Sequence, residues 1–167
     1  MTATDPGAAG GLSRDDRQDI ADVLVRYATG IDRRDWTLFR TCFTEDCDAD
    51  YGVIGAWQGA DAITAWMRDT HEPCGHTLHR ITNVAVTPAP DGDGDGDGDG
   101  DADPGRAIAR AYVDVVLLDG ANRVATRACG YYDDELVRTN DGWKIARRRY
   151  TSVLVELGIE GVDLSGA

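Results

Sequence analysis

The chain of 167 residues is short of positive charge, with 17 Lys and Arg residues against 30 Asp and Glu residues and a net charge of -13. Nucleic acids and anionic membranes bind proteins through clustered positive charge, so we expect neither as a partner. No apolar run approaches the roughly 18–20 residues that a membrane span needs. The N-terminus lacks the basic and apolar regions of a signal peptide, and we therefore expect a cytoplasmic protein.

The sequence also lacks the motifs that usually bind metals and cofactors. There is no Gly-rich phosphate loop, no G-x-S-x-G elbow and no HExxH helix. The four cysteines form no CxxC pair, which favours reduced thiols over a zinc site; they are Cys42, Cys47, Cys74 and Cys129. We therefore expect neither a metal nor a cofactor.

Much of the negative charge lies in one low-complexity Asp-Gly tract. Seven aspartates fall between Asp91 and Asp103, and removing their charge from -13 leaves -6 for the rest of the chain. The tract resembles a calcium-binding loop, but Ala102 stands where a bidentate Glu would complete the coordination. We predict a solvated hairpin loop over residues 90–105, because long loops cost little additional closure entropy.

The rest of the chain shows helical periodicity first and strand periodicity later. Ser13 is the predicted N-cap of a helix whose apolar stripe includes Ile20, Val23, Leu24 and Tyr27. Shorter helices are predicted over 35–42 and 59–70, with one or two short strands over 47–57. Period-two strands are predicted from His76 onward and over 106–118, 122–138 and 142–154, with Gly-containing hairpin turns between the last three.

This order predicts an α+β fold in which N-terminal helices pack on a strongly curved antiparallel sheet. We expect one domain over 12–155, with tails at 1–11 and 156–167. Helices folded over a curved sheet enclose a conical cavity, which is a natural small-molecule site. Apolar residues occupy both faces of the strand around Val113 and Val116, so the outer face predicts a homodimer or homotrimer.

Few ionisable residues accompany the apolar segments. His79 falls on one strand face with Ile81, and either an ordinary core histidine or a general base oriented by a carboxylate fits that position. Tyr27 and Asp32 lie near the end of the first helix. They fit either two polar residues of a functional site or a core tyrosine and an aspartate that caps the turn. In the run 147–149, parity places Arg148 on the face opposite to its two neighbours.

Four segments, in this order along the chain, resemble the nuclear transport factor 2-like superfamily, in particular its SnoaL-like branch. They are Tyr27-A-T-G-I-Asp32-R-R-D-W, F-T-E-D at 43–46, His79-R-I-T-Asn83 and Gly142-W-K-I-A-R-Arg148. The resemblance covers about residues 12–155. It implies a cone-shaped α+β barrel, and it is strongest toward the dehydratases and the dehydrochlorinase of the superfamily that use an Asp–His dyad.

By this resemblance Asp32 orients His79, His79 abstracts a proton, Tyr27 is a second polar residue of the cone, and Arg148 contacts the leaving group. Asp114 lies where related enzymes place another polar pocket residue. Four aromatic residues are the further candidates for binding an apolar, ring-containing substrate: Tyr51, Trp57, Trp66 and Tyr131.

These residues favour a cofactor-independent lyase, in the first place a dehydratase acting on a carbonyl-containing natural-product intermediate. The same base and the same enolate would serve an isomerase or a polyketide cyclase. A third reading is a ligand-binding module that has a pocket but no turnover.

Overall fold

The computed structural model describes residues 11–90 and 103–158. The predicted tails and the Asp-Gly tract fall largely outside these ranges. The elements, in chain order, are α1 (Arg14–Asp32), α2 (Trp36–Arg40), β1 (Phe43–Asp50), the 3₁₀ turn η1 (Gly52–Ile54), β2 (Ala56–Gln58), α3 (Ala60–His71), β3 (Thr77–Pro88), β4 (Arg106–Leu118), β5 (Val124–Thr139) and β6 (Gly142–Leu157). Within the described residues, no helix is both long and apolar enough to cross a membrane.

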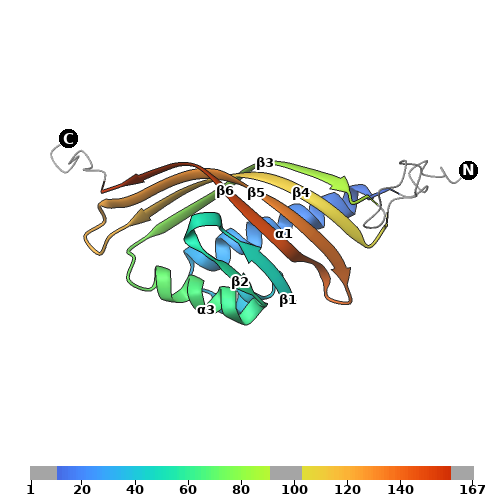
Figure 1. The fold of residues 1–167 in the computed structure, drawn as a ribbon, viewed down its shortest axis with the longest axis horizontal. Helices are drawn as coiled ribbons and strands as arrows, with labels where there is room; N and C mark the ends of the chain where they lie inside the picture. Colours follow the sequence, from blue (N-terminus) through green and yellow to red (C-terminus); the bar gives the residue numbers. More distant parts are fainter. Residues whose placement is uncertain (1–10, 91–102, 159–167) are drawn as a thin grey trace, which may run out of the picture.

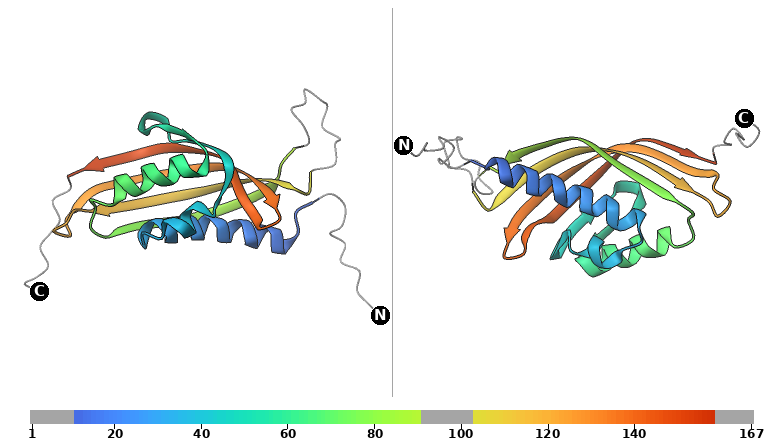
Figure 2. Two further views of the ribbon diagram at one scale, coloured as in Figure 1. Left: turned by 90° about the horizontal axis from the view of Figure 1, so that it is seen from below. Right: turned by 180° about the vertical axis from the view of Figure 1, so that it is seen from behind.

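The first helix begins where the sequence predicts. The Ser13 side chain accepts a hydrogen bond from the Asp16 backbone, and the Asp16 side chain accepts one from the Ser13 backbone, which completes a capping box. The predicted stripe of Ile20, Val23, Leu24 and Tyr27 is buried. This stripe faces the sheet, and Figure 2 shows α1 lying across it in the right-hand view.

Six strands form one curled sheet in the order β2-β1-β6-β5-β4-β3. The α+β class and the packing of helices on a curved sheet are confirmed (Figure 1). The sheet is mixed rather than wholly antiparallel, because β1 runs parallel to β6 with Ala49 opposite Arg148. It is also open, since β2 and β3 are its two edges.

Close packing near the end of α1 fixes the position of the following turn. A Cβ on Gly30 would lie 2.9 Å from both the nitrogen and the Cα of Phe39 in α2. Glycine is therefore required for α2 to fold back against α1, which places Asp32 over the start of β3.

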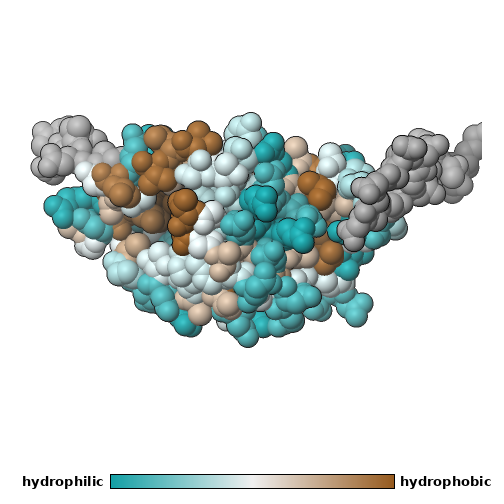
Figure 3. All heavy atoms as spheres, viewed as in Figure 1, coloured by the Kyte–Doolittle hydropathy of each residue, from teal (hydrophilic) through white to brown (hydrophobic). Residues whose placement is uncertain are grey.

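The end of the β5–β6 pair nearest the C-terminus extends beyond α1 (Figure 2). β6 continues to Leu157, two residues past the predicted end of the domain. Its last apolar residues are exposed: Val153, Leu154, Val155 and Leu157. Figure 3 shows hydrophobic atoms gathered at this end of the molecule, at the upper left.

Candidate active site

Asp32 and His79 meet although 47 positions separate them in the sequence. Asp32 is the last residue of α1, and His79 lies near the start of β3, the edge strand against which α1 packs. The Asp32 Oδ1 atom is 2.7 Å from His79 Nδ1, and the His79 backbone N–H donates to Oδ2 at 2.9 Å. The contact predicted between these two side chains is therefore present.

The geometry holds Asp32 ionised and assigns the tautomer of His79. Burial raises the pKa of the Asp32 carboxyl, but hydrogen bonds from the His79 ring, the His79 backbone and Thr77 outweigh it and leave the pKa below its usual value. An ionised carboxylate only accepts hydrogen bonds, so Nδ1 of His79 carries the proton. In the neutral ring, Nε2 is then a free base.

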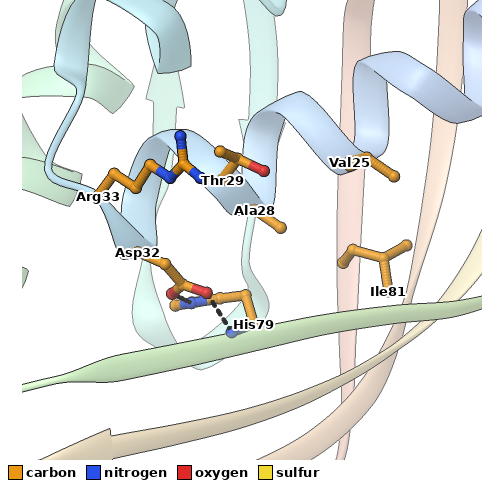
Figure 4. Close-up of a pocket in the computed structure, with 7 residues that line it drawn as sticks. All are labelled: Val25, Ala28, Thr29, Asp32, Arg33, His79 and Ile81. Atoms are coloured by element: carbon orange, nitrogen blue, oxygen red, sulfur yellow. Dashed lines mark hydrogen bonds and ion pairs between the residues drawn. The ribbon is translucent and has the colours of Figure 1, made fainter.

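Two recesses meet at this pair. On the outside, a groove of about 340 Å³ between α1 and β3 is lined by Val25, Ala28, Thr29, Asp32, Arg33, His79 and Ile81. Figure 4 shows the Asp32 carboxylate turned toward the His79 ring, while the Arg33 guanidinium points away from it. The His79 side chain is 5% exposed and that of Asp32 24% exposed, so solvent reaches the carboxylate more readily than the ring.

On the inside, His79 forms part of the wall of an apolar cavity of about 200 Å³. Aromatic and aliphatic side chains from α1, α3 and the sheet line this cavity: Tyr27, Tyr51, Ile54, Trp66, Met67, Thr70, His71, His79, Val115, Leu117, Thr126, Ala128, Tyr132, Tyr150 and Val155. Nε2 of His79 makes no hydrogen bond to any residue in the described ranges. Its lone pair is therefore not engaged by these residues.

A second histidine adjoins the pair. His71 is the last residue of α3, one position beyond the predicted end of that helix, and its ring centroid is 5.5 Å from that of His79. Its Nδ1 donates to the carbonyl of Met67 at 2.8 Å. Burial, together with the neighbouring His79, lowers the pKa of His71 to about 4. His71 is therefore neutral near pH 7.

Three tyrosine hydroxyls converge at another part of the cavity wall. The Tyr27 hydroxyl is 2.9 Å from that of Tyr51 and 3.3 Å from that of Tyr132. Burial raises the pKa of each of these hydroxyls, so all three keep their protons. Two contacts engage two of the three protons, so one hydroxyl proton is not engaged within the cluster.

Arg148 lies behind this tyrosine cluster and is completely buried. Its Nε and Nη2 donate to Asp134 at 2.7 and 2.6 Å, and its guanidinium stacks on the rings of Tyr27 and Tyr132 at 4.1 and 3.9 Å from their centroids. Burial alone would lower the pKa of Arg148, but Asp134 raises it well above its ordinary value. As parity predicts, Arg148 lies on the face opposite to Arg147 and Arg149, which are exposed. The predicted contact with a leaving group is not what the structure supports, because Arg148 is not part of the cavity wall.

Three other predicted site residues also lie outside the cavity wall. Tyr131 and Asp114 point to the opposite face of the sheet, where Tyr131 stacks under Arg110 and Asp114 pairs with Arg80. Trp57 packs on Trp66 with ring centroids 4.1 Å apart and so supports the wall without lining it. Of the predicted binding residues, Tyr51 and Trp66 line the cavity.

Sequence reasoning overlooked Tyr132, Tyr150 and the position of His71. Tyr132 is the sequence neighbour of the predicted Tyr131, and alternation alone could not say which of the two faces the helices. Tyr132 and Tyr150 are cross-strand partners in β5 and β6, but a register shift between Glu135 and Leu136 produces this pairing, so the hairpin turn alone could not have predicted it. The helical spacing of Trp66 and Met67 with Thr70 and His71 could have extended the third helix to His71.

The chain belongs to the SnoaL-like domain family, whose profile matches residues 13–149. An uncharacterised protein of Mycobacterium tuberculosis H37Rv is 31% identical over 135 residues, which cover 80% of this chain and 82% of that protein. The resemblance inferred from the four sequence segments is thus confirmed at the level of the family.

Solved structures share the fold over most of their length. A protein of Novosphingobium aromaticivorans, named provisionally as an aromatic-ring hydroxylase, aligns with a TM-score of 0.71 and 26% identity over 87% of this chain and 95% of that one. A type 2 hexachlorocyclohexane dehydrochlorinase aligns with a TM-score of 0.71 and 16% identity over 91% of this chain and 99% of that one. At that identity the dehydrochlorinase indicates the shared fold alone.

Proposed function

We propose that this protein is a cofactor-independent lyase, in the first place a dehydratase of a carbonyl-containing natural-product intermediate. The observation that carries the proposal is the 2.7 Å contact between Asp32 and His79, whose ring adjoins an apolar cavity. A histidine with its tautomer fixed by a carboxylate is a general base that works near neutral pH. Its place in the SnoaL-like family adds support, together with structures of the same fold that are named as a dehydrochlorinase and, provisionally, a scytalone dehydratase.

The proposed reaction is a β-elimination in two steps. Nε2 of His79 takes a proton from the carbon next to the carbonyl, and the C–H electron pair forms the carbon–carbon double bond of an enolate. The enolate re-forms the carbonyl and expels the hydroxyl group on the β-carbon. The proton on Nε2 passes to the departing hydroxide, so that water leaves and His79 returns to its starting state.

The tyrosine cluster would stabilise the enolate oxygen. One hydroxyl proton among Tyr27, Tyr51 and Tyr132 is not engaged within the cluster, and it can be donated to that oxygen. The charge of Arg148 lies directly behind two of these rings and favours negative charge in front of them. Arg148 would act through the tyrosines and would not touch the substrate.

The cavity indicates an uncharged, largely apolar substrate. Its wall presents polar groups mainly at the histidines and at the tyrosine hydroxyls, and aromatic or aliphatic surface elsewhere. A volume of about 200 Å³ lies between a cavity that binds benzene, roughly 150 Å³, and the roughly 300–1,000 Å³ of drug-sized pockets. A compound of one or two rings with a ring carbonyl and a β-hydroxyl fits these requirements.

The test is a mass-spectrometric screen of cyclic β-hydroxy ketones with the wild-type protein and the variant Asp32→Asn. We expect loss of one water from a substrate with the wild type, and a rate about 10⁴-fold lower with the variant, the size known for the same change in a catalytic triad. Asp114→Asn is the matched control, because it makes the same change on the outer face of the sheet.

The other outcomes of this screen would support a different function or contradict the mechanism. Substrate consumed without change of mass would support an isomerase or a cyclase that uses the same enolate. Binding without consumption would support the non-catalytic module. Full activity of Asp32→Asn would contradict the Asp–His mechanism itself.

We also propose that the protein forms a homo-oligomer through the outer face of the sheet. Leu78, Tyr112 and Leu154 lie on that face and are exposed in the single chain. Burial of such residues against a second copy would remove apolar surface from water. Sedimentation at micromolar concentration should show a dimer or trimer, and a monomer would contradict the proposal.

A further inference from the structure

Arg34 has an unusual conformation directly after the end of α1. Its φ of 57° lies in the left-handed region, which residues other than glycine rarely adopt. In this conformation the guanidinium reaches three acceptors: the Ile31 carbonyl at 2.8 Å, the Gly75 carbonyl at 2.9 Å and the Thr77 hydroxyl at 2.9 Å. Arg34 therefore ties the end of α1 to the residues that begin β3.

The contact with Arg34 determines which way the Thr77 hydroxyl points. A guanidinium can only donate, so the Thr77 oxygen is the acceptor in that bond. The single hydroxyl proton of Thr77 is then left for its other partner, Oδ1 of Asp32 at 3.0 Å. Thr77 is buried, and water does not compete for this proton.

Asp32 consequently receives three hydrogen bonds from β3. Thr77 and the His79 ring both donate to Oδ1, and the His79 backbone donates to Oδ2. A carboxylate held by three donors cannot rotate without losing them, and its negative charge is shared among them. The chain Arg34–Thr77–Asp32–His79 thus links a surface-reaching cation to the proposed base.

We infer that Arg34 and Thr77 are positioning residues that hold Asp32 in place and set the basicity of His79. The inference rests on the proposed function, in which His79 is the base, and it assigns no substrate contact to either residue. The charged and titratable groups around His79 come from three parts of the molecule. They are Asp32, Arg33 and Arg34 at the end of α1, His71 from α3, and the protonated tyrosines of the cavity wall. The partner of His79 across the sheet, Val115, is uncharged.

The test follows the titration of the His79 ring by ¹H–¹⁵N NMR in the intact protein, with no substrate needed. The resonances of the three histidines are separated with His76→Gln, which alters an exposed residue. In Thr77→Val the charge of Asp32 loses one donor and stabilises the protonated ring more strongly. We expect the His79 midpoint to rise by about half a pH unit or more, which is about a threefold gain in proton affinity.

Arg34→Met should raise the midpoint in the same direction, since it removes a positive charge and releases the Thr77 hydroxyl. Thr77→Ser keeps the hydroxyl and should titrate as the wild type does. Arg33→Met is the matched charge control, because Arg33 is the neighbouring residue but its guanidinium points away from Asp32 (Figure 4). Circular dichroism establishes that each variant is folded, and Arg34→Met serves as the test if Thr77→Val is not.

An unchanged midpoint in both Thr77→Val and Arg34→Met would overturn the inference. So would a shift in Thr77→Ser equal to that in Thr77→Val, or one in Arg33→Met equal to that in Arg34→Met. The outcome is separate from that of the proposed function. If the midpoint shifts but no substrate is consumed, the network stands and the lyase proposal fails; turnover with an unshifted midpoint means the reverse.

Discussion

Two aspartates pair with basic side chains in this fold, and their surroundings differ. Asp134 and Arg148 face each other across neighbouring strands, are at most 1% exposed, and have aromatic rings against the guanidinium. Asp32 and His79 join a helix end to an edge strand, with the carboxylate 24% exposed and one ring nitrogen without a partner among the described residues.

The difference shows how similar residue types serve different purposes. An arginine with its pKa raised well above its ordinary value keeps its charge at every pH the protein meets, so Arg148 cannot act as a base. A histidine changes its charge within the physiological range, and its pair adjoins both a groove and a cavity. The Asp134–Arg148 pair therefore holds a fixed charge, whereas the Asp32–His79 pair contains the residue that we propose as the base.

The largest expected effect comes from breaking the buried Asp134–Arg148 pair. Asp134→Asn leaves Arg148 with an unbalanced buried charge, and we expect the free energy of unfolding to fall by about 3–5 kcal/mol. Replacing both residues by apolar ones, Asp134→Leu with Arg148→Met, should restore much of that loss. Urea denaturation measures all three proteins. A double variant no more stable than the single one would show that the pair does more than balance its own charges.

The next largest effect concerns pH and His71, the histidine beside the Asp32–His79 pair. Unfolded, His71 has its ordinary pKa of 6.5, whereas the folded protein lowers it to about 4. As the pH falls between these values the unfolded state binds the proton first, so stability decreases, by about 3 kcal/mol in total. Denaturation from pH 7.5 to 4 should show this loss in the wild type and in His76→Gln. The loss should be absent in His71→Gln, and its persistence there would assign it to another group.

A smaller effect tests the tyrosines that separate Arg148 from the cavity. Tyr132→Phe removes the hydroxyl that lies 3.3 Å from that of Tyr27, and we expect a loss of about 1 kcal/mol in unfolding free energy. Tyr131→Phe makes the same change on the outer face, where we expect less than about 0.5 kcal/mol. Equal losses in thermal or urea unfolding would contradict the assignment of these neighbours to opposite faces.

The smallest effect is expected at Asp133, next to the buried Asp134–Arg148 pair. Asp133 adjoins Asp134 in the sequence, but it lies on the outer face and pairs with Arg110 at 2.9 Å, with both side chains at least 40% exposed. Water screens such a pair, so Asp133→Asn should change stability by less than about 0.5 kcal/mol. A loss comparable to that of Asp134→Asn would mean that burial does not control the difference between these carboxylates.

The candidate site was partly predictable from sequence. Asp32, His79, Tyr27 and Tyr51 were all selected, and the structure brings each of them to the cavity or to the pair. Residues on strands were harder to select. Adjacent positions in β5 point to opposite faces, and the pairs Tyr131 with Tyr132 and Asp133 with Asp134 differ little in chemistry. Apolar residues on both faces of the sheet removed the usual signal for the buried side.

The hairpins of the sheet were predictable, and the pairing of β1 with β6 was not. Gly-containing turns link β4 to β5 and β5 to β6, and local turn geometry sets the register next to each turn, although both pairs shift register farther along the strands. The parallel contact between β1 and β6 joins segments almost a hundred residues apart. No local pattern encodes it, and it formed no part of the predicted sheet.

The sequence by itself determined the features that depend on near neighbours: the capped first helix, the later strands and the order of helices before sheet. Its ordered motifs also indicated the family, and with it the Asp32–His79 contact. Only the tertiary structure decided that Arg148 is enclosed by Asp134 and two tyrosines, that His71 adjoins the pair, and that Arg34 reaches Thr77. These contacts depend on how elements remote in the chain pack together, and burial then determines which charges are exposed to solvent and which are not.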